Sequence, residues 1–479
     1  MLSAADTKRG LRLGFYDGMC SVVMGTLTSG VFLTGFALAL GATELQIGIL
    51  AALPPFANLA QLLAAYLLER SGRRKWLCVG GAALSRGLWL LTVALPFAVI
   101  GPGKPVWVLS AIIGGSSVFF AMSSTAWQSW MRDLVPGSMR GRYFARRTQL
   151  QAAVGIAASL AAGWFIDYWK AEYPRNLTMG FALLFTVGVL FGLLGLLPLG
   201  LTPEPPAHLS ARQPFWRLLS LPFRDRNFRR LMAYAMAWAF STALASTFFI
   251  VYMLNDIRLD YAQVVIFSFF DQGMNLLSLG LWGRLTDRYG NKPVILFGGL
   301  LASTTAFCWI FAAPGHYAII PIIYLINGFA FAGIGLASGN ILLKVSPNEH
   351  NAVYISVYSV LVGFAGALAP ILGGYLAQSF EGRELWISFS YSDYGRLSVL
   401  PVLKLRHFHF LFLLSSLCRF LSNSLLVAVR EEGEAPVHEL VRASLRTLGT
   451  VASARNLVTR LVRKPQRHRE ALPEQTPKE

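Results

Sequence analysis

Among the ionisable residues inside the long apolar stretches of the chain, four are candidates for a buried partner or a function, because a charge there is otherwise costly. They are Asp17, Arg86, Asp271 and Arg419. Asp271 is the most informative, because the amide residues Gln272 and Asn275 follow it on the same stretch. A carboxyl group at this depth can carry a proton, since an apolar environment favours its neutral form.

Each of the two acids also has an arginine at a suitable depth in its own half of the chain. Asp17 is the nearest acid to Arg86, and a structural ion pair between them is favoured over a gating or substrate role. Arg419 lies at a depth similar to that of Asp271. Two interpretations of Asp271 therefore stay open, namely proton coupling and a permanent pair with Arg419 that titrates little.

The elements that must position these residues are membrane-spanning helices. Hydrophobic residues make up 54% of the 479 residues and charged residues only 14%, against about 25% charged residues in a soluble domain. Apolar runs of about 20 residues can cross a hydrocarbon core of about 30 Å. Twelve such runs occur, at 15–39, 45–68, 76–100, 106–130, 150–169, 177–201, 231–254, 262–285, 294–313, 318–345, 352–380 and 408–429. The sequence predicts an all-α polytopic membrane protein.

Residue types that would indicate catalysis, a metal or a cofactor are scattered. Each of the four cysteines stands singly in an apolar run, and the seven histidines are spread through loops and the C-terminal region. The chain has no nucleotide-binding loop of the G-x-x-x-x-G-K-[ST] type. We therefore expect no metal, no cofactor and no enzymatic activity.

The distribution of basic residues predicts the topology. If the N-terminus is cytoplasmic, 32 of the 42 Lys and Arg residues fall in cytoplasmic segments and 8 in outer loops. Cytoplasmic loops retain positive charge, so both termini are predicted to be cytoplasmic in a multi-pass protein of the cell membrane. The net charge of +18 then indicates anionic lipid headgroups of the inner leaflet as partners, and not nucleic acid.

A charged loop motif occurs twice. Residues 283–292 read G-x-x-x-D-R-x-G-N-K, with Gly283, Asp287, Arg288, Gly290 and Lys292. A weaker copy at 65–74 has Glu69, Arg70, Gly72 and Arg73. The copies are about half a chain apart, and the loops 136–143 and 347–354 repeat at nearly the same spacing. This indicates two six-helix halves related by a parallel pseudo-repeat.

The two loop motifs resemble those of the major facilitator superfamily, and the resemblance covers roughly residues 15–429. It implies a twelve-helix secondary transporter that works by alternating access. It also implies that Glu69 lies against the start of helix 11 near Ala352, and Asp287 against the start of helix 5. A carboxylate is stabilised at a helix N-terminus by the dipole and the unpaired N–H groups. These contacts would form a latch on the cytoplasmic side, to which the other motif residues belong.

The resemblance further implies a central cavity lined by helices 1, 4, 7 and 10. Its candidate lining, with neighbours on helix 8, is Thr26, Ser29, Trp238, Thr242, Gln272, Asn275, Asn327 and Asn340. This lining is polar but short of charge, which favours a neutral or amphiphilic substrate. The chain lacks the helix 4 arginine of many proton-coupled members and the helix 5 Gly-Pro of antiporters, so proton antiport stays in doubt.

The predicted organisation is an N-terminal half at 1–201, a cytoplasmic linker at 202–230, a C-terminal half at 231–429 and a basic amphipathic tail at 430–479. The predicted function is secondary active or facilitative transport of a small molecule by a monomer, with protons as a candidate coupling ion. A membrane sensor or scaffold on the same fold, and a polytopic membrane enzyme, are the alternatives. The long outer loop at 381–406 has no interpretation.

Overall fold

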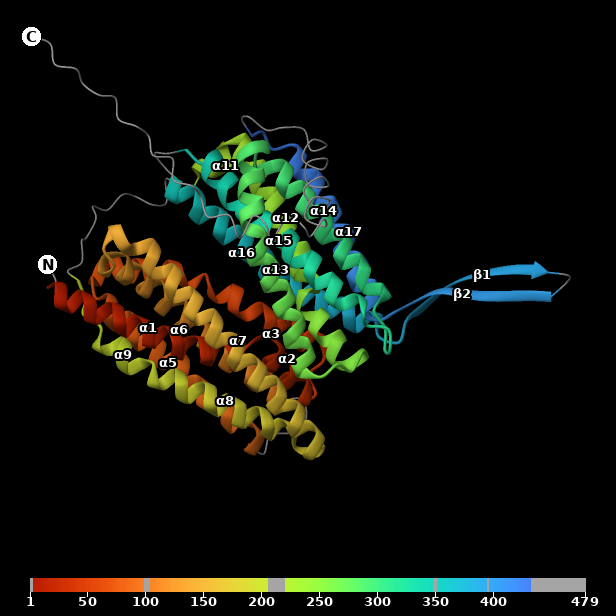
Figure 1. The fold of residues 1–479 in the computed structure, drawn as a ribbon, viewed down its shortest axis with the longest axis horizontal. Helices are drawn as coiled ribbons and strands as arrows, with labels where there is room; N and C mark the ends of the chain where they lie inside the picture. Colours follow the sequence, from red (N-terminus) through yellow and green to blue (C-terminus); the bar gives the residue numbers. More distant parts are fainter. Residues whose placement is uncertain (1–2, 99–103, 206–219, 348–350, 394–395, 432–479) are drawn as a thin grey trace, which may run out of the picture.

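The computed structural model describes residues 3–98, 104–205, 220–347, 351–393 and 396–431. Within these residues, twelve helices are long and apolar enough to cross a membrane. The predicted all-α membrane architecture is therefore confirmed. The helices form two bundles that meet near α2 (Gly30–Ala39) and diverge toward the starts of α16 (Asn351–Phe380) and α1 (Ala4–Leu27) (Figure 1).

The N-terminal bundle holds the first six spans. The first and second spans are each divided, into α1 and α2 and into α3 (Glu44–Ala57) and α4 (Ala60–Ser71). The remaining helices are α5 (Arg74–Ala94), α6 (Lys104–Leu134), α7 (Arg140–Glu172), α8 (Leu177–Leu194) and α9 (Leu196–Leu201). The interruption after α3 follows Pro54 and Pro55, which have no N–H to continue the helical hydrogen bonds.

The C-terminal bundle holds the other six spans. The short helix α11 (Leu221–Arg224) leads into α12 (Arg226–Val251), which ends in a π-helical turn at Tyr252–Asp256. Then follow α13 (Tyr261–Tyr289), α14 (Asn291–Cys308), α15 (Ile319–Val345), α16 and α17 (Phe408–Val427). The second span of each bundle begins with a capping box, which Thr43 forms with Gln46 in α3 and Asp260 forms with Gln263 in α13. This match agrees with the predicted duplication.

The long loop between α16 and α17 forms a β-hairpin, which the sequence analysis did not predict. Strands β1 (Glu384–Asp393) and β2 (Arg396–Arg406) pair antiparallel, and the hairpin projects away from the helices (Figure 1). We call the side of the molecule that carries this hairpin the hairpin face. The opposite side, which carries Ala4, Ser71, Leu201 and Val427, is the terminal face.

The bundles are joined by two helix pairs close to the hairpin face. In the pair α3–α16, Gly48 lies against the backbone of Pro370, and Gly374 lies against Glu44. In the pair α7–α13, a side chain at Gly163 would come 2.9 Å from the Cα of Ala262. These contacts require glycine, because any larger residue would push the two backbones apart.

On the terminal face, the described contacts tie loops to their own bundle. The buried Arg74 pairs with Asp133 inside the N-terminal bundle. Glu204 accepts a hydrogen bond of 3.0 Å from the N–H of Lys75 at the start of α5.

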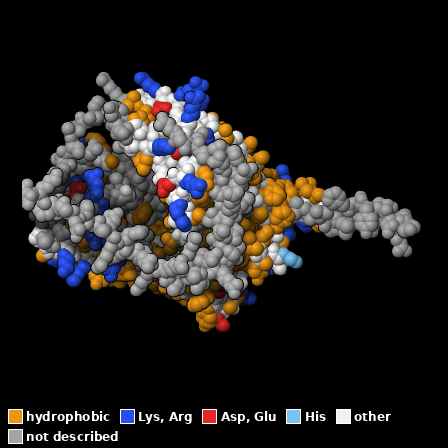
Figure 2. Space-filling view, turned by 45° about the horizontal axis from the view of Figure 1, so that its top comes forward, with side chains coloured by type: hydrophobic (Ala, Val, Ile, Leu, Met, Phe, Trp, Pro, Cys, Tyr) orange, Lys and Arg blue, Asp and Glu red, His pale blue; other side chains and the backbone are white. Residues whose placement is uncertain are grey.

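In Figure 2, Lys and Arg side chains gather at the upper and left margins of the face in view, whereas the flank toward the hairpin is largely hydrophobic.

Candidate functional site

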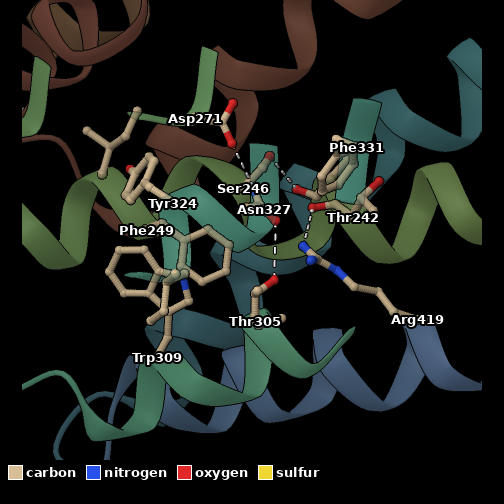
Figure 3. Close-up of a pocket in the computed structure, with 14 residues that line it drawn as sticks. Thr242, Ser246, Phe249, Asp271, Thr305, Trp309, Tyr324, Asn327, Phe331 and Arg419 are labelled. Atoms are coloured by element: carbon tan, nitrogen blue, oxygen red, sulfur yellow. Dashed lines mark hydrogen bonds between the residues drawn. The ribbon is translucent and has the colours of Figure 1, made fainter. Parts of the chain in front are cut away.

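A cavity of about 420 Å³ lies inside the C-terminal bundle, between α12, α13, α14, α15 and α17. Its polar lining is Thr242, Ser246, Asp271, Thr305, Asn327 and Arg419, and its aromatic lining is Phe249, Trp309, Tyr324 and Phe331 (Figure 3). This volume falls in the range of small-molecule sites, which combine an apolar wall with a few polar groups. We call it the Arg419 cavity.

Asp271 and Arg419 lie on opposite sides of Asn327 in this cavity (Figure 3). The Asn327 amide donates to Asp271 Oδ1 at 3.4 Å. The Thr305 hydroxyl lies 3.2 Å from Asn327 Oδ1 and 3.0 Å from the carbonyl oxygen of Ala302. Arg419 donates to the same Ala302 carbonyl at 2.9 Å. A chain of neutral groups therefore connects the acid to the arginine.

The permanent Asp271–Arg419 ion pair that the sequence left open is absent from the part of the chain that the structure describes. Arg419 instead donates to the carbonyl oxygens of Ala302 and Thr242, at 2.9 and 3.4 Å. Its Nε has no hydrogen-bond partner in the described structure, and the residue is only 4% exposed. The physical reason is spacing, because Asn327 and Thr305 stand between the two charged side chains.

The sequence analysis predicted a lining short of charge for a central cavity between the halves, and the Arg419 cavity lies elsewhere, inside the C-terminal bundle. Asp271 and Arg419 both line the same space. Both residues lie on helices other than the four that were expected to line the central cavity. Here α13 and α17 contribute these two side chains to the lining. The backbone of α13 at Asp271 can approach α15 closely because residue 328 of α15 is glycine.

A second cavity, of about 440 Å³, lies between α1, α2 and α7 of one bundle and α13 of the other. Three candidate residues line it, namely Thr26, Ser29 and Gln272, together with Gln151 of α7. The other candidates, Trp238, Asn275 and Asn340, line neither of the two cavities. Trp238 packs in the core of the C-terminal bundle, against Tyr234 and Phe331.

The N-terminal bundle contains a buried charge network around Asp17. Arg86 lies 3.3 Å from Asp17 Oδ1, which is the pair that the sequence predicts. Arg147 of α7 approaches Asp17 Oδ2 at 4.0 Å and stacks over the ring of Trp127. Arg86 also donates to Ser21 at 2.8 Å. These contacts tie α1, α5, α6 and α7 together.

The latch contact expected for Asp287 is not formed in this structure. The side chain of Asp287 is exposed and has no hydrogen bond or ion pair among the described residues. Arg288 stacks on Tyr289, while Arg70 and Arg73 are exposed. The bundles are joined near the hairpin face, so the end of α13 stands away from α7. The side chains of Glu69 and Ala352 lie outside the described residues.

The motif glycines have separate roles. Gly72 and Gly290 end their helices with positive φ angles of 64° and 89°, which glycine adopts without steric cost. Gly283 lies inside α13, and a side chain there would meet nothing within 4 Å. Lys292 donates from its ammonium group to the carbonyl oxygen of Val429 at 2.8 Å.

Sequence reasoning missed two carboxylates at helix starts. Asp167 of α7 accepts hydrogen bonds from the N–H groups of Tyr261 and Ala262, at 2.7 and 2.8 Å, and so joins the two bundles at the hairpin face. Glu431 accepts from the N–H groups of Asn291 and Lys292, at 3.0 and 2.8 Å. Asp167 lies near the end of the apolar run 150–169 and Glu431 just after the run 408–429, which was the available signal.

Twelve apolar helices in two repeated bundles, with cavities inside and between them, define a polytopic membrane protein with the architecture of a transporter. The chain belongs to the major facilitator superfamily, because the family model described as MFS/sugar transport protein matches residues 66–385. This membership in a family of transporters favours transport over catalysis.

Among curated relatives, the citrate-proton symporter of Klebsiella pneumoniae is 25% identical over 358 residues, which cover 69% of this chain and 76% of that protein. A probable peptide/nitrate transporter of Arabidopsis thaliana is 36% identical over 116 residues, 24% of this chain and 23% of that protein. The chain thus spans about a quarter of the length of the first curated relatives that it matches.

Solved structures share the fold. The nucleoside transporter NupG superimposes with a TM-score of 0.64 at 13% identity, over 88% of this chain and 98% of that chain. The xylose transporter XylE from E. coli, in its inward open conformation, superimposes with a TM-score of 0.55 at 18% identity, over 91% of this chain and 98% of that chain.

Proposed function

We propose that this protein is a secondary transporter that moves a small molecule across the cell membrane by alternating access. The observation that carries the proposal is the uneven contact between the bundles. They pack backbone to backbone at Gly48, Gly163 and Gly374 near the hairpin face, while Asp287 at the terminal face is exposed. In a fold whose halves rock against each other, this is one end state of the cycle.

The terminal face is the cytoplasmic one in this proposal. The excess of basic residues on that side supports the assignment, and anionic headgroups of the inner leaflet would be its lipid partners. The structure is then open toward the cytoplasm. In the opposite state, Asp287 and Glu69 would reach the starts of α7 and α16 and form the predicted latch. We take the working unit to be a monomer, since each chain has both bundles.

The Arg419 cavity is the proposed substrate site, and Asp271 is the proposed proton carrier. The carboxyl group of Asp271 is held by one neutral amide, Asn327, and by no cation among the described residues. A carboxyl group in this setting can exchange its proton without breaking an ion pair. The similarity to a citrate-proton symporter supports proton coupling.

Distance measurements between spin labels test the alternating access directly. In a background without the four cysteines, one pair at Ser71 and Arg288 reports on the terminal face. A matched pair at Tyr173 and Glu381 reports on the hairpin face, and all four positions are exposed. We expect two populations, in which the terminal distance shortens as the hairpin distance lengthens. Distances that stay single and constant in lipid, at several pH values and with a ligand panel, would favour a static sensor or scaffold.

A further inference from the structure

The guanidinium of Arg419 is buried beside a cavity without an anionic partner. The residue is 4% exposed and makes two hydrogen bonds, both to backbone carbonyl oxygens. Its Nε donor is unused, and no carboxylate forms an ion pair with it within the described residues. A buried charge without a counter-charge is strongly unfavourable. The cavity therefore has a standing electrostatic preference for an anion.

The rest of the cavity limits what that anion can be. Phe249 and Trp309 stack with ring centroids 4.7 Å apart and an interplanar angle of 23°, and Tyr324 lies 6.1 Å from Trp309. These rings form an apolar wall beside the polar chain from Asp271 to Arg419. An aromatic or branched apolar group would pack against such a wall. The volume of about 420 Å³ fits a small organic molecule and not a peptide.

The unpaired guanidinium of Arg419 favours a single negative charge on the ligand. Arg419 is the one cation in its lining, and Asp271 is the one acid. A second carboxylate on the ligand would face Asp271 or the aromatic wall, where it would lack a partner. Neither a ligand amine nor a neutral sugar would give Arg419 a counter-charge.

We infer that the Arg419 cavity binds a small organic monocarboxylate with an aromatic or branched apolar body. The carboxylate accepts hydrogen bonds from Arg419, in the bidentate manner that guanidinium groups favour. The apolar body lies against Phe249, Trp309 and Tyr324. This inference rests on the proposed function, because it names the substrate class of the proposed transport site.

Three probes of nearly equal shape test the inference on the purified full-length protein. They are 3-phenylpropionate, its uncharged amide 3-phenylpropionamide and the cation 3-phenylpropylamine. Binding is followed by tryptophan fluorescence, since Trp309 lines the cavity, and by thermal shift. We expect the carboxylate to bind at least about tenfold more tightly than either analogue, because only it pairs with the arginine. Equal or tighter binding of the amide or amine, or no binding of any probe, would overturn the inference.

Two variants locate the effect. Arg419→Gln should remove the preference for the carboxylate over the amide. Arg86 is a largely buried arginine of the other bundle that already has Asp17 as its partner, so Arg86→Gln should keep this preference. A preference that survives Arg419→Gln contradicts the assignment. If that variant does not fold, Arg419→Lys keeps the charge and should retain part of the preference, while the comparison of probes on the natural chain decides by itself.

The measurement separates this inference from the proposed function. Equilibrium binding requires no transport. If the carboxylate binds through Arg419 but the spin-label distances stay constant, the binding site is supported and the transport proposal is wrong. If the spin-label distances change but the carboxylate is not preferred, transport is supported and the assignment of the site is wrong.

Discussion

Asp167 Oδ2 accepts a hydrogen bond of 2.8 Å from the backbone N–H of Ala262, and these two residues belong to different bundles. The other oxygen of the same carboxylate accepts from Tyr261 at 2.7 Å. A carboxylate at the start of a helix thus joins the halves, as was predicted for Asp287. The contact lies at the opposite face of the molecule.

Asp167→Ala should therefore shift the balance between the two conformations. Loss of a capping group costs about 0.5–2 kcal/mol, so the state open at the hairpin face should gain about 2- to 30-fold in population. Spin labels at Tyr173 and Glu381 measure this shift. Asp260→Ala is the matched control, since Asp260 caps the same helix from within its own bundle. It should lower stability and leave the populations unchanged; an equal shift in both variants would contradict the role of Asp167.

The hydrogen bonds of Glu431 predict that part of the free energy of unfolding depends on pH. Burial alone would raise the pKa of this carboxyl group. Hydrogen bonds from the Lys292 and Asn291 backbones, the Asn291 amide and the Lys344 ammonium outweigh burial, so its pKa is lowered from 4.5. The stabilisation is present in full above about pH 4.5 and is lost as the pH falls through the lowered pKa.

Glu431→Gln should accordingly cost about 1–3 kcal/mol of the free energy of unfolding at pH 7, and the difference from the natural chain should shrink below pH 4.5. Thermal unfolding in detergent across this pH range measures it. Glu204→Gln, at the equivalent place in the first bundle, should cost less, because Glu204 accepts a single described hydrogen bond there. Equal stability of the Glu431 variant and the natural chain at pH 7 would refute the account.

Asp271→Asn tests the coupling to protons. The substitution keeps the size of the side chain and its place beside Asn327, and removes the titration. A ligand at about 100 times its dissociation constant adds about 2.7 kcal/mol to stability. We expect the affinity of a ligand to depend on pH in the natural chain and not in the variant. A variant that is unstable with and without ligand would mean that Asp271 is structural and that our coupling proposal is wrong.

The network around Asp17 predicts an asymmetric effect of removing charge. Asp17→Asn leaves Arg86 and Arg147 buried without an anion, and loss of one partner of a buried pair costs about 3–5 kcal/mol. Arg86→Gln should cost less, because Arg147 still lies 4.0 Å from Asp17. Denaturation followed by tryptophan fluorescence compares the two variants. A larger loss for Arg86→Gln would contradict the shared role of Asp17.

The spans could be predicted because each is determined by its own hydropathy and length. The twelve apolar runs correspond to twelve candidate spans among the described residues. The pair of Arg86 with Asp17 could be predicted because both residues lie in one bundle at compatible depth. The hairpin also had a local signal, which went unused. Residues 388–392 alternate serine with Phe389 and Tyr391, the period of a β-strand.

The candidate site was harder to predict, because its contacts depend on the packing of distant helices. Nothing near Arg419 in the sequence shows that Asn327 and Thr305 separate it from Asp271. The partners of Asp167 and Glu431 are backbone N–H groups, which every residue has, so no pattern of residue types identifies them. Glu431, near the start of the predicted tail at 430–479, packs on the C-terminal bundle, and residues 432–479 lie outside the described residues.

The close glycine contacts between α3 and α16 mean that side-chain size alone can select a conformation. At Gly48 an added methyl group would overlap the backbone of Pro370, so a bulkier residue acts as a steric wedge that disfavours the state seen here. On the same helix α16, nothing lies within 4 Å of a side chain at Gly363 or Gly366. A larger residue at either position would therefore leave this state undisturbed. Of these positions on one pair of helices, only Gly48 would thus shift the balance of conformations when its side chain is enlarged.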